Sequence, residues 1–180
     1  MPVYISIIRG INVSGQKMIR MDALKELYAS LKFSDIRTYI QSGNVIFSSN
    51  AMARAELEKR IGKKIAETFG FDVPVMVLGT ADIRTVLENN PFVTRRKEDP
   101  SLLHVTFLAH EPSEANIEAV LQAQSGDDEC VVSGRTVYLY CPNGYGRTKL
   151  NNTFFEKKFQ TIATTRNWKT VNELYRISME

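Results

Sequence analysis

Four short polar segments of the chain combine positive charge with side chains that donate hydrogen bonds. They are residues 9–17, 41–44, 142–150 and 164–170, with the sequences RGINVSGQK, QSGN, PNGYGRTKL and TTRNWKT. Each of the last two precedes an expected helix start, where unpaired backbone N–H groups and the helix dipole favour an anion. These residue types therefore predict binding of a phosphate or another anionic group.

The candidate ligand-binding residues divide by the work expected of their side chains. The lysines and the other arginines would neutralise the anion, Arg9 and the asparagine and glutamine side chains would orient it, and an indole ring would stack on a base. The set is Arg9, Asn12, Lys17, Gln41, Ser42, Asn44, Gly144, Arg147, Thr148, Lys149, Arg166, Asn167 and Trp168. The alternative is that these are turn and cap residues that bond their own backbone. The GYGRTKL segment is glycine-rich and basic but lacks the GxxxxGK[ST] spacing of a P-loop.

Apolar periodicity in the first half predicts the element order βαββαβ. Strands are expected at Val3–Arg9, Ile36–Gln41, Asn44–Ser49 and Val73–Leu78, with helices whose apolar stripes begin at Met21 and Leu57. Asn50, or a serine before it, is the expected cap of the second helix, and Ser42-Gly43 is an expected tight turn. In this order the first and third strands are antiparallel neighbours. Residues 9–17 and 41–44 should therefore share one end of the sheet.

The second half predicts the same order, after a short helix capped by Thr80 and a charged connector at residues 92–101. Strands are expected at Leu103–Ala109, Glu129–Ser133, Thr136–Cys141 and Ile162–Thr165, and helices begin near Pro112, Leu150 and Asn167. Residues 142–150 and 164–170 follow the third and fourth of these strands. Both segments should therefore meet at one end of the second sheet.

The whole pattern predicts an α+β protein of two consecutive βαββαβ (ferredoxin-like) subdomains with antiparallel sheets, plus a C-terminal helix. The expected limits are residues 1–79 for the first subdomain, 80–101 for the short helix and connector, and 102–180 for the second subdomain with the C-terminal helix. No residue-level repeat relates the two halves, so the duplication is one of pattern only.

Composition gives the broad class of the protein. The 180 residues are 43% apolar and 24% charged, as in an ordinary globular protein. The net charge of +3 divides into +4, −6 and +5 over residues 1–79, 80–129 and 130–180, which allows a basic face. The N-terminus has no cationic leader, no apolar run approaches the roughly 20 residues of a membrane span, and two cysteines indicate a reducing compartment. We expect a cytoplasmic protein without a cofactor or membrane association, and the sequence indicates no oligomeric state.

A metal or thiol site is an alternative that the second half raises, because all the histidines and cysteines fall there, at His104, His110, Cys130 and Cys141. Cys130 and Cys141 differ in strand parity about the expected turn at Gly134, which argues against a zinc pair or a disulfide. Cys141 is interpreted as a buried thiol, with a reactive thiol as the alternative. Residues 127–129 (DDE) are interpreted as a solvated acidic turn rather than a metal site.

An RNA-binding module is a further alternative, because βαββαβ is also the order of the RNA recognition motif. Tyr138 and Tyr140 lie two residues apart on the expected third strand of the second half, where stacking aromatics would sit. The surrounding SGRTVYLY matches the RNP1 pattern only loosely. The two rings would equally suit packing inside the protein.

The chain resembles a widespread, mainly bacterial family known as domain of unknown function sixteen-ninety-seven. The resemblance rests on RGINV at Arg9–Val13, TYIQSGNVIF at Thr38–Phe47, VTFL at Val105–Leu108, YLYCPNGYGRTKL at Tyr138–Leu150 and ATTRNWKTV at Ala163–Val171. It implies two α+β subdomains related to the ferredoxin-like fold. It implies little about activity, because the family is biochemically uncharacterised. Thr148 stands where a serine is more usual, which keeps the hydroxyl group.

Three functions follow from these residues. The first is binding of a phosphorylated or otherwise anionic ligand, a nucleotide or a nucleic-acid segment, through the basic loops. The second is an enzyme that acts on a phosphate ester or nucleotide by positioning and electrostatics, for which the sequence offers no general base. The third is a structural or protein-interaction module, in which the motifs lock the two subdomains together and bind no small ligand.

Overall fold

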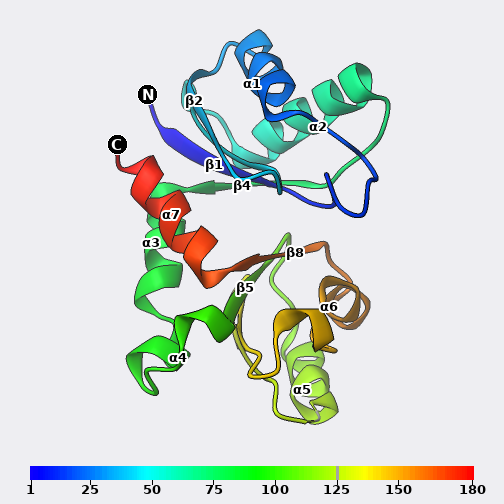
Figure 1. Ribbon diagram of the computed structural model, residues 1–180, viewed down its shortest axis with the longest axis vertical. Helices are drawn as coiled ribbons and strands as arrows, with labels where there is room; N and C mark the ends of the chain where they lie inside the picture. Colours follow the sequence, from blue (N-terminus) through cyan, green and yellow to red (C-terminus); the bar gives the residue numbers. More distant parts are fainter. Residues whose placement is uncertain (125) are drawn as a thin grey trace. The chain divides into compact units, whose positions relative to one another are not determined.

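The computed structural model describes residues 1–124 and 126–180 and begins with the predicted βαββαβ order (Figure 1). The first set of elements is β1 (Val3–Ile8), α1 (Met21–Ser30), β2 (Ser34–Tyr39), β3 (Asn44–Ser48), α2 (Arg54–Phe69) and β4 (Val75–Gly79). The second set follows α3 (Thr80–Glu88), α4 (Pro91–Thr94) and the 3-10 turn η1 (Pro100–Leu102). It consists of β5 (Leu103–Leu108), α5 (Glu114–Ala123), β6 (Glu129–Ser133), β7 (Thr136–Tyr140), η2 (Tyr145–Arg147), α6 (Asn152–Phe159), β8 (Ala163–Asn167) and α7 (Trp168–Ser178).

The chain forms two compact units, and the first is discontinuous in sequence. Unit 1 contains residues 1–84 and 173–180, and unit 2 contains residues 85–172. The last helix, α7, therefore begins in unit 2 and ends in unit 1. The subdomain limits expected from the sequence, at residues 79 and 102, stay a prediction.

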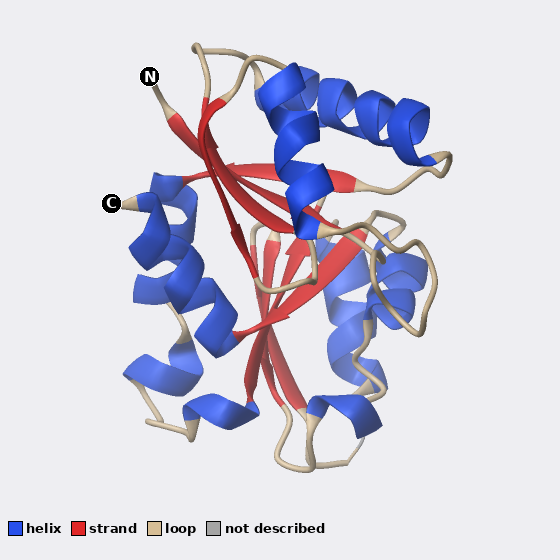
Figure 2. Cartoon of the chain, turned by 45° about the horizontal axis from the view of Figure 1, so that its top comes forward, coloured by secondary structure: helices blue, strands red, loops and turns tan. Residues whose placement is uncertain are grey.

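The sheet of unit 1 has the strand order β2-β3-β1-β4, and all its pairs are antiparallel. Ile7 lies opposite Asn44, and the Ile8 N–H donates to the Gly43 carbonyl at 2.8 Å. The end of β1 and the start of β3 are therefore neighbours, which confirms the predicted strand arrangement. Figure 2 colours the long connection from β1 to α1 tan, because it contains neither a helix nor a full strand.

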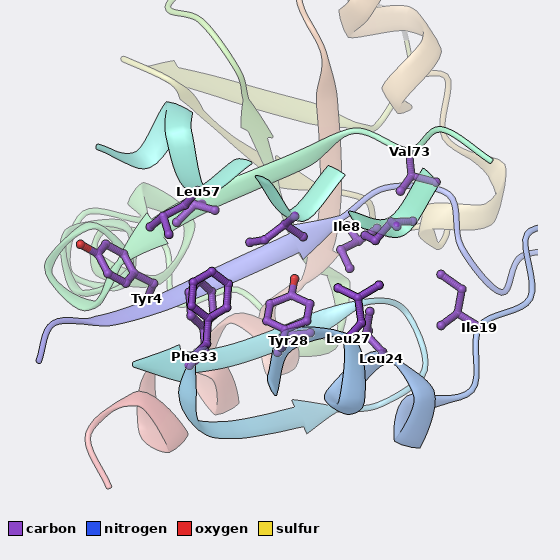
Figure 3. Close-up of a cluster of buried hydrophobic side chains, with 14 of the residues drawn as sticks. Tyr4, Ile8, Ile19, Leu24, Leu27, Tyr28, Phe33, Leu57 and Val73 are labelled. Carbon is purple, nitrogen blue, oxygen red and sulfur yellow. The ribbon is translucent and has the colours of Figure 1, made fainter. Parts of the chain in front are cut away.

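The core of unit 1 lies between this sheet and the two helices α1 and α2, which cover the same face (Figure 1). Leu24 and Leu27 of α1 and Leu57 of α2 are buried in it, as their helical spacing predicts. Tyr28 is also buried, and Figure 3 shows its hydroxyl pointing toward the strands. The Tyr28 hydroxyl and the Ser6 Oγ lie 2.7 Å apart, so the one polar atom of this ring has a partner.

The sheet of unit 2 repeats the arrangement with the order β6-β7-β5-β8. Its core lies under α5 and α6 and includes Val120, Phe155 and Phe159 from these helices. The end of β7 and the end of β8 both pair with the start of β5, where Leu103 is opposite Tyr140 and His104 is opposite Asn167. The segments that follow β7 and β8 therefore leave the same end of the sheet, as predicted.

Three local predictions in unit 1 and unit 2 are wrong in detail. Helix α2 begins at Arg54, and its cap is Ala53, which is extended. The Tyr4 hydroxyl bonds both main-chain groups of Met52 (3.3 and 3.4 Å) and so holds Met52 outside the helix. The turn before β3 has four residues, since Tyr39 pairs directly with Asn44. Strand β8 runs on to Asn167, so Arg166 lies in the sheet rather than in a loop.

The other face of the unit 2 sheet is covered, so the arrangement of an RNA recognition motif does not apply. Tyr138 is buried, and its hydroxyl donates to the Val86 carbonyl of α3 at 3.0 Å. Phe92 of α4 packs against the Tyr140 ring with centroids 5.8 Å apart, and the Arg96 guanidinium lies 5.3 Å from the same ring. The two tyrosines are therefore interior contacts between the sheet and the α3–α4 segment.

Candidate functional site

Asn12 forms the centre of the first group of predicted site residues. Its Nδ2 donates to the carbonyls of Ile19 (3.0 Å) and Gln41 (2.8 Å), and its Oδ1 accepts from the Ile19 N–H (2.7 Å). Both hydrogens of the amide are therefore used inside the protein. Asn12 has a φ of +55°, a left-handed conformation that asparagine tolerates better than most residues. The side chain joins residues 12–19 to the turn before β3.

Residues 13–17, in the connection from β1 to α1, form a small hairpin-like turn. Val13 and Gln16 pair across Ser14 and Gly15, both of which have positive φ, at +51° and +71°. Positive φ at both central residues is typical of a type I′ hairpin turn. Lys17 follows the turn, and its Nζ donates to the Asp72 carbonyl at 3.1 Å. The predicted cation of this loop therefore has a backbone partner.

The QSGN segment is held by its own polar groups and by close packing. Asn44 is fully buried, and its Nδ2 donates to the Tyr39 carbonyl (3.1 Å) and to the Ser42 Oγ (2.9 Å). Gly43 has a φ of +86°, and a Cβ placed on it would lie 2.9 Å from the Ile8 Cβ and 3.0 Å from the Ile11 Cδ1. Only glycine fits there, for reasons of both backbone angle and space. Arg9, at the end of β1, is half-buried beside this turn, and its N–H donates to the Pro74 carbonyl.

The second group of predicted residues begins in the loop between β7 and α6. Gly144 has a φ of +89° and an open Cβ position, and the chain then makes the η2 turn. Thr148 is buried (8% exposed), and its Oγ1 accepts from the Leu150 N–H at 3.0 Å. Thr148 therefore shapes the loop from inside, and Asn151 caps α6 by accepting from the Phe154 N–H.

A cavity of about 620 Å³ opens between this loop and the segment that precedes β6. Arg147, Lys149 and Asn143 line it on the loop side, and Asp127 and Asp128 line it on the other. The side chains of Arg147 and Lys149 are exposed and make no hydrogen bond or ion pair with the described residues. The cavity therefore brings two exposed cations together with two carboxylates.

The carboxylates of this cavity differ in their surroundings. The Asp127 Oδ2 accepts a long hydrogen bond from the Asn143 Nδ2 (3.4 Å). The Asp128 Oδ1 is buried and has no hydrogen-bond partner among the described residues. A buried carboxylate oxygen without a donor is unfavourable. The sequence interpretation of residues 127–129 as a solvated turn missed this placement, because only the fold brings the turn opposite Arg147 and Lys149.

Arg166 and Asn167 end β8, Trp168 begins α7, and none of the three is among the residues that line this cavity. Burial lowers the pKa of Arg166 to about 10, and its Nη1 donates to the Thr165 carbonyl at 3.0 Å. The Asn167 Oδ1 accepts from the Thr170 N–H at 2.8 Å and so caps the start of α7. Trp168 is 7% exposed, which leaves little of its ring for stacking on a base.

His104 is a residue of interest that the sequence reasoning considered only as a zinc ligand. Its ring stacks on the Tyr145 ring of the η2 turn, with centroids 4.6 Å apart. Its Nδ1 is buried and has no partner among the described residues, and burial lowers the pKa of the imidazole. His104 therefore supports the β7–α6 loop from the sheet as a neutral ring. The sequence predicts that residues 142–150 and 164–170 meet at one end of the second sheet. His104 lies at that end, opposite Asn167, so this prediction could have drawn attention to it.

The described residues show neither a cluster of metal ligands nor a membrane-spanning helix. In residues 1–124 and 126–180, no three His, Cys, Asp or Glu side chains group as metal ligands would. None of the helices in the described part of the chain has the length and apolar character of a membrane span.

Comparison with known proteins places the chain by fold and by family. A solved structure, that of the conserved bacterial protein SP0830 from Streptococcus pneumoniae, is similar with a TM-score of 0.78 over 98% of each chain and 22% sequence identity. At this identity the similarity shows the fold. No curated protein sequence matches the chain significantly.

A family model described as "Protein of unknown function (DUF1697)" matches residues 1–138. The matched part contains the RGINV and TYIQSGNVIF segments, whereas residues 142–150 and 163–171 lie beyond it. The match covers well over half of the sequence and agrees with the resemblance seen in the motifs. The chain is therefore a member of the DUF1697 family, with two ferredoxin-like α+β sheets.

Proposed function

We propose that unit 2 binds a small phosphorylated molecule in the cavity beside the Gly144–Leu150 loop. The observation that supports this most is the pair of exposed cations, Arg147 and Lys149, which line one cavity and have no partners among the described residues. A volume of about 620 Å³ is in the range of small-molecule sites. A nucleotide fits this description better than a nucleic-acid strand, which needs a long basic groove.

The loop has the features that a phosphate requires. The open Cβ position at Gly144 lets a ligand approach the backbone closely. The cations sit on either side of Thr148, whose Oγ1 accepts a hydrogen bond from the Leu150 N–H and so fixes the backbone of the loop. Two charge-assisted contacts to a phosphate would each contribute roughly 1.5–3 kcal/mol before the costs of binding. Because both side chains are exposed, added salt would weaken these contacts.

The predicted residues of unit 1 fit a structural role within that unit better than ligand binding. Asn12, Lys17 and Asn44 all direct donors to backbone carbonyls of the same unit. A donor that is already bonded must break that bond before it can bind a ligand. We propose that RGIN and QSGN hold the end of the unit 1 sheet in shape.

Calorimetric titration tests the binding proposal with pyrophosphate, the four ribonucleoside monophosphates and a short single-stranded oligonucleotide as probes. We expect binding of a monophosphate that weakens with rising salt and falls at least tenfold in the Arg147→Ala and Lys149→Ala variants. Lys25→Ala is the matched control, because it removes an exposed cation from α1. Equal affinity in all variants, or binding by none of the probes, would overturn the proposal. A preference for the oligonucleotide would instead identify the cavity as a nucleic-acid-binding site.

A further inference from the structure

The cavity of unit 2 has charges of both signs, and this limits what it can accept. Arg147 and Lys149 contribute two positive charges, and Asp127 and Asp128 contribute two negative charges to the same lining. A ligand that is anionic throughout, such as pyrophosphate or a nucleic-acid strand, would be attracted by one side and repelled by the other. A suitable ligand has an anionic end and a separate end that donates hydrogen bonds.

Asp128 is the residue that would contact the hydrogen-bond-donating end of the ligand. Asp128 lines the cavity, and its Oδ1 is buried and lacks a hydrogen-bond donor in the described residues. The neighbouring Asp127 receives only the 3.4 Å contact from Asn143. A carboxylate accepts but cannot donate when ionised, so the missing partner must supply O–H or N–H groups. Ribose hydroxyls are recognised in this way by acidic side chains in dinucleotide-binding folds.

We infer that the cavity takes a phosphate ester of a polyhydroxy compound, with the phosphate on Arg147 and Lys149 and the hydroxyl groups on Asp127 and Asp128. This inference rests on the proposed function, because it assumes the phosphate end, and it adds the chemical class of the rest of the ligand. A ribose phosphate, free or as part of a nucleotide, belongs to this class.

The test compares ribose 5-phosphate with methyl phosphate, which keeps the phosphate ester and lacks the hydroxyl groups. We expect ribose 5-phosphate to bind roughly tenfold more tightly than methyl phosphate, from one charge-assisted hydrogen bond gained. In Asp128→Asn this preference should be lost, while methyl phosphate binds as well as before or better, because a repelling charge is removed. Asp127→Asn provides a second variant at the more exposed carboxylate.

Glu111→Gln is the control, since it removes an exposed carboxylate that follows β5, at the opposite end of the sheet from the cavity. Thermal unfolding of each variant checks that the fold is intact. Equal binding of the two probes, or a preference that survives in both aspartate variants, would overturn the inference and leave the proposed function in place. If neither probe binds to the wild-type protein, the proposed function fails as well.

Discussion

Asn12 shows how a side chain with the character of a ligand-binding group can have a structural role. Its three hydrogen bonds connect the strand end, the start of α1 and the turn before β3. The φ of Asn12, +55°, is a second reason why this position favours asparagine. The sequence predicted that these segments meet, because strand order alone decides which loops share a sheet end. Whether the amide faces outward or inward depends on carbonyl positions that a residue pattern does not contain.

Replacing Asn12 with alanine should lower the free energy of unfolding by about 2–4 kcal/mol. The part-buried carbonyl and N–H of Ile19 and the exposed carbonyl of Gln41 lose their partner, and alanine is strained at this positive φ. Chemical denaturation measures the change. Gln16→Ala in the same loop is the control and should cost less than about 0.5 kcal/mol, because Gln16 is exposed and its side chain makes no hydrogen bond with the described residues. Similar losses in the two variants would contradict a structural role for Asn12.

At the scale of the element, the β6–β7 hairpin corrects the parity argument for the cysteines. Ser133 pairs with Thr136 across a two-residue turn, so an even-numbered residue of β6 shares a face with odd-numbered residues of β7. Cys130 and Cys141 consequently belong to the same core cluster, although neither lies opposite the other. Both are free thiols in the structure. The sequence located the turn, but the face of each residue depends on the exact number of turn residues.

Burial makes these two thiols poor nucleophiles. It raises the pKa of Cys130 to about 12 and that of Cys141 to about 11, from an ordinary value of 9.0. We expect negligible reaction of the folded protein with Ellman's reagent at pH 8, and release of two equivalents when denaturant is added. Fast reaction of a thiol in the folded state that is lost in Cys141→Ala would show that Cys141 is a reactive site after all.

The raised pKa values of the two thiols also predict how the stability of the fold changes with pH. Each folded-state pKa is raised, so the contribution of a thiol is fully present below pH 9.0 and is lost as pH rises through the folded values. Stability should therefore fall above pH 9 more steeply in the wild type than in a Cys130→Ala, Cys141→Ala double variant.

At the scale of the molecule, periodicity was sufficient to predict both sheets and their strand order. Apolar stripes such as Leu57, Ile61 and Ile65 mark helices clearly, and all three residues are buried in the structure. The cavity could not be predicted, because Asp127 and Arg147 are separated by two strands and approach only in the folded unit. The role of the last helix was also missed, since its assignment to unit 1 follows from contacts and not from order along the chain.

Removing residues 173–180 should destabilise unit 1, although these residues follow unit 2 in the sequence. The deletion takes away buried Leu174 and Ile177 and the ion pair between Arg37 and Glu180. Two buried aliphatic side chains stabilise a fold by roughly 3–6 kcal/mol, whereas an exposed ion pair contributes about 1 kcal/mol or less. Scanning calorimetry should show a large fall in the melting temperature after the deletion and a small one for Arg37→Ala. An unchanged transition in the truncated chain would contradict the assignment of these residues to unit 1.

The chain leaves unit 1 after Arg84 and returns to it at Glu173. A ribosome makes these two parts at different times, with the whole of unit 2 between them. Every strand of unit 2 is available before Leu174 and Ile177 emerge to complete unit 1. The unit whose strands are synthesised first is thus the last to be completed, because its final segment is made after the whole of unit 2.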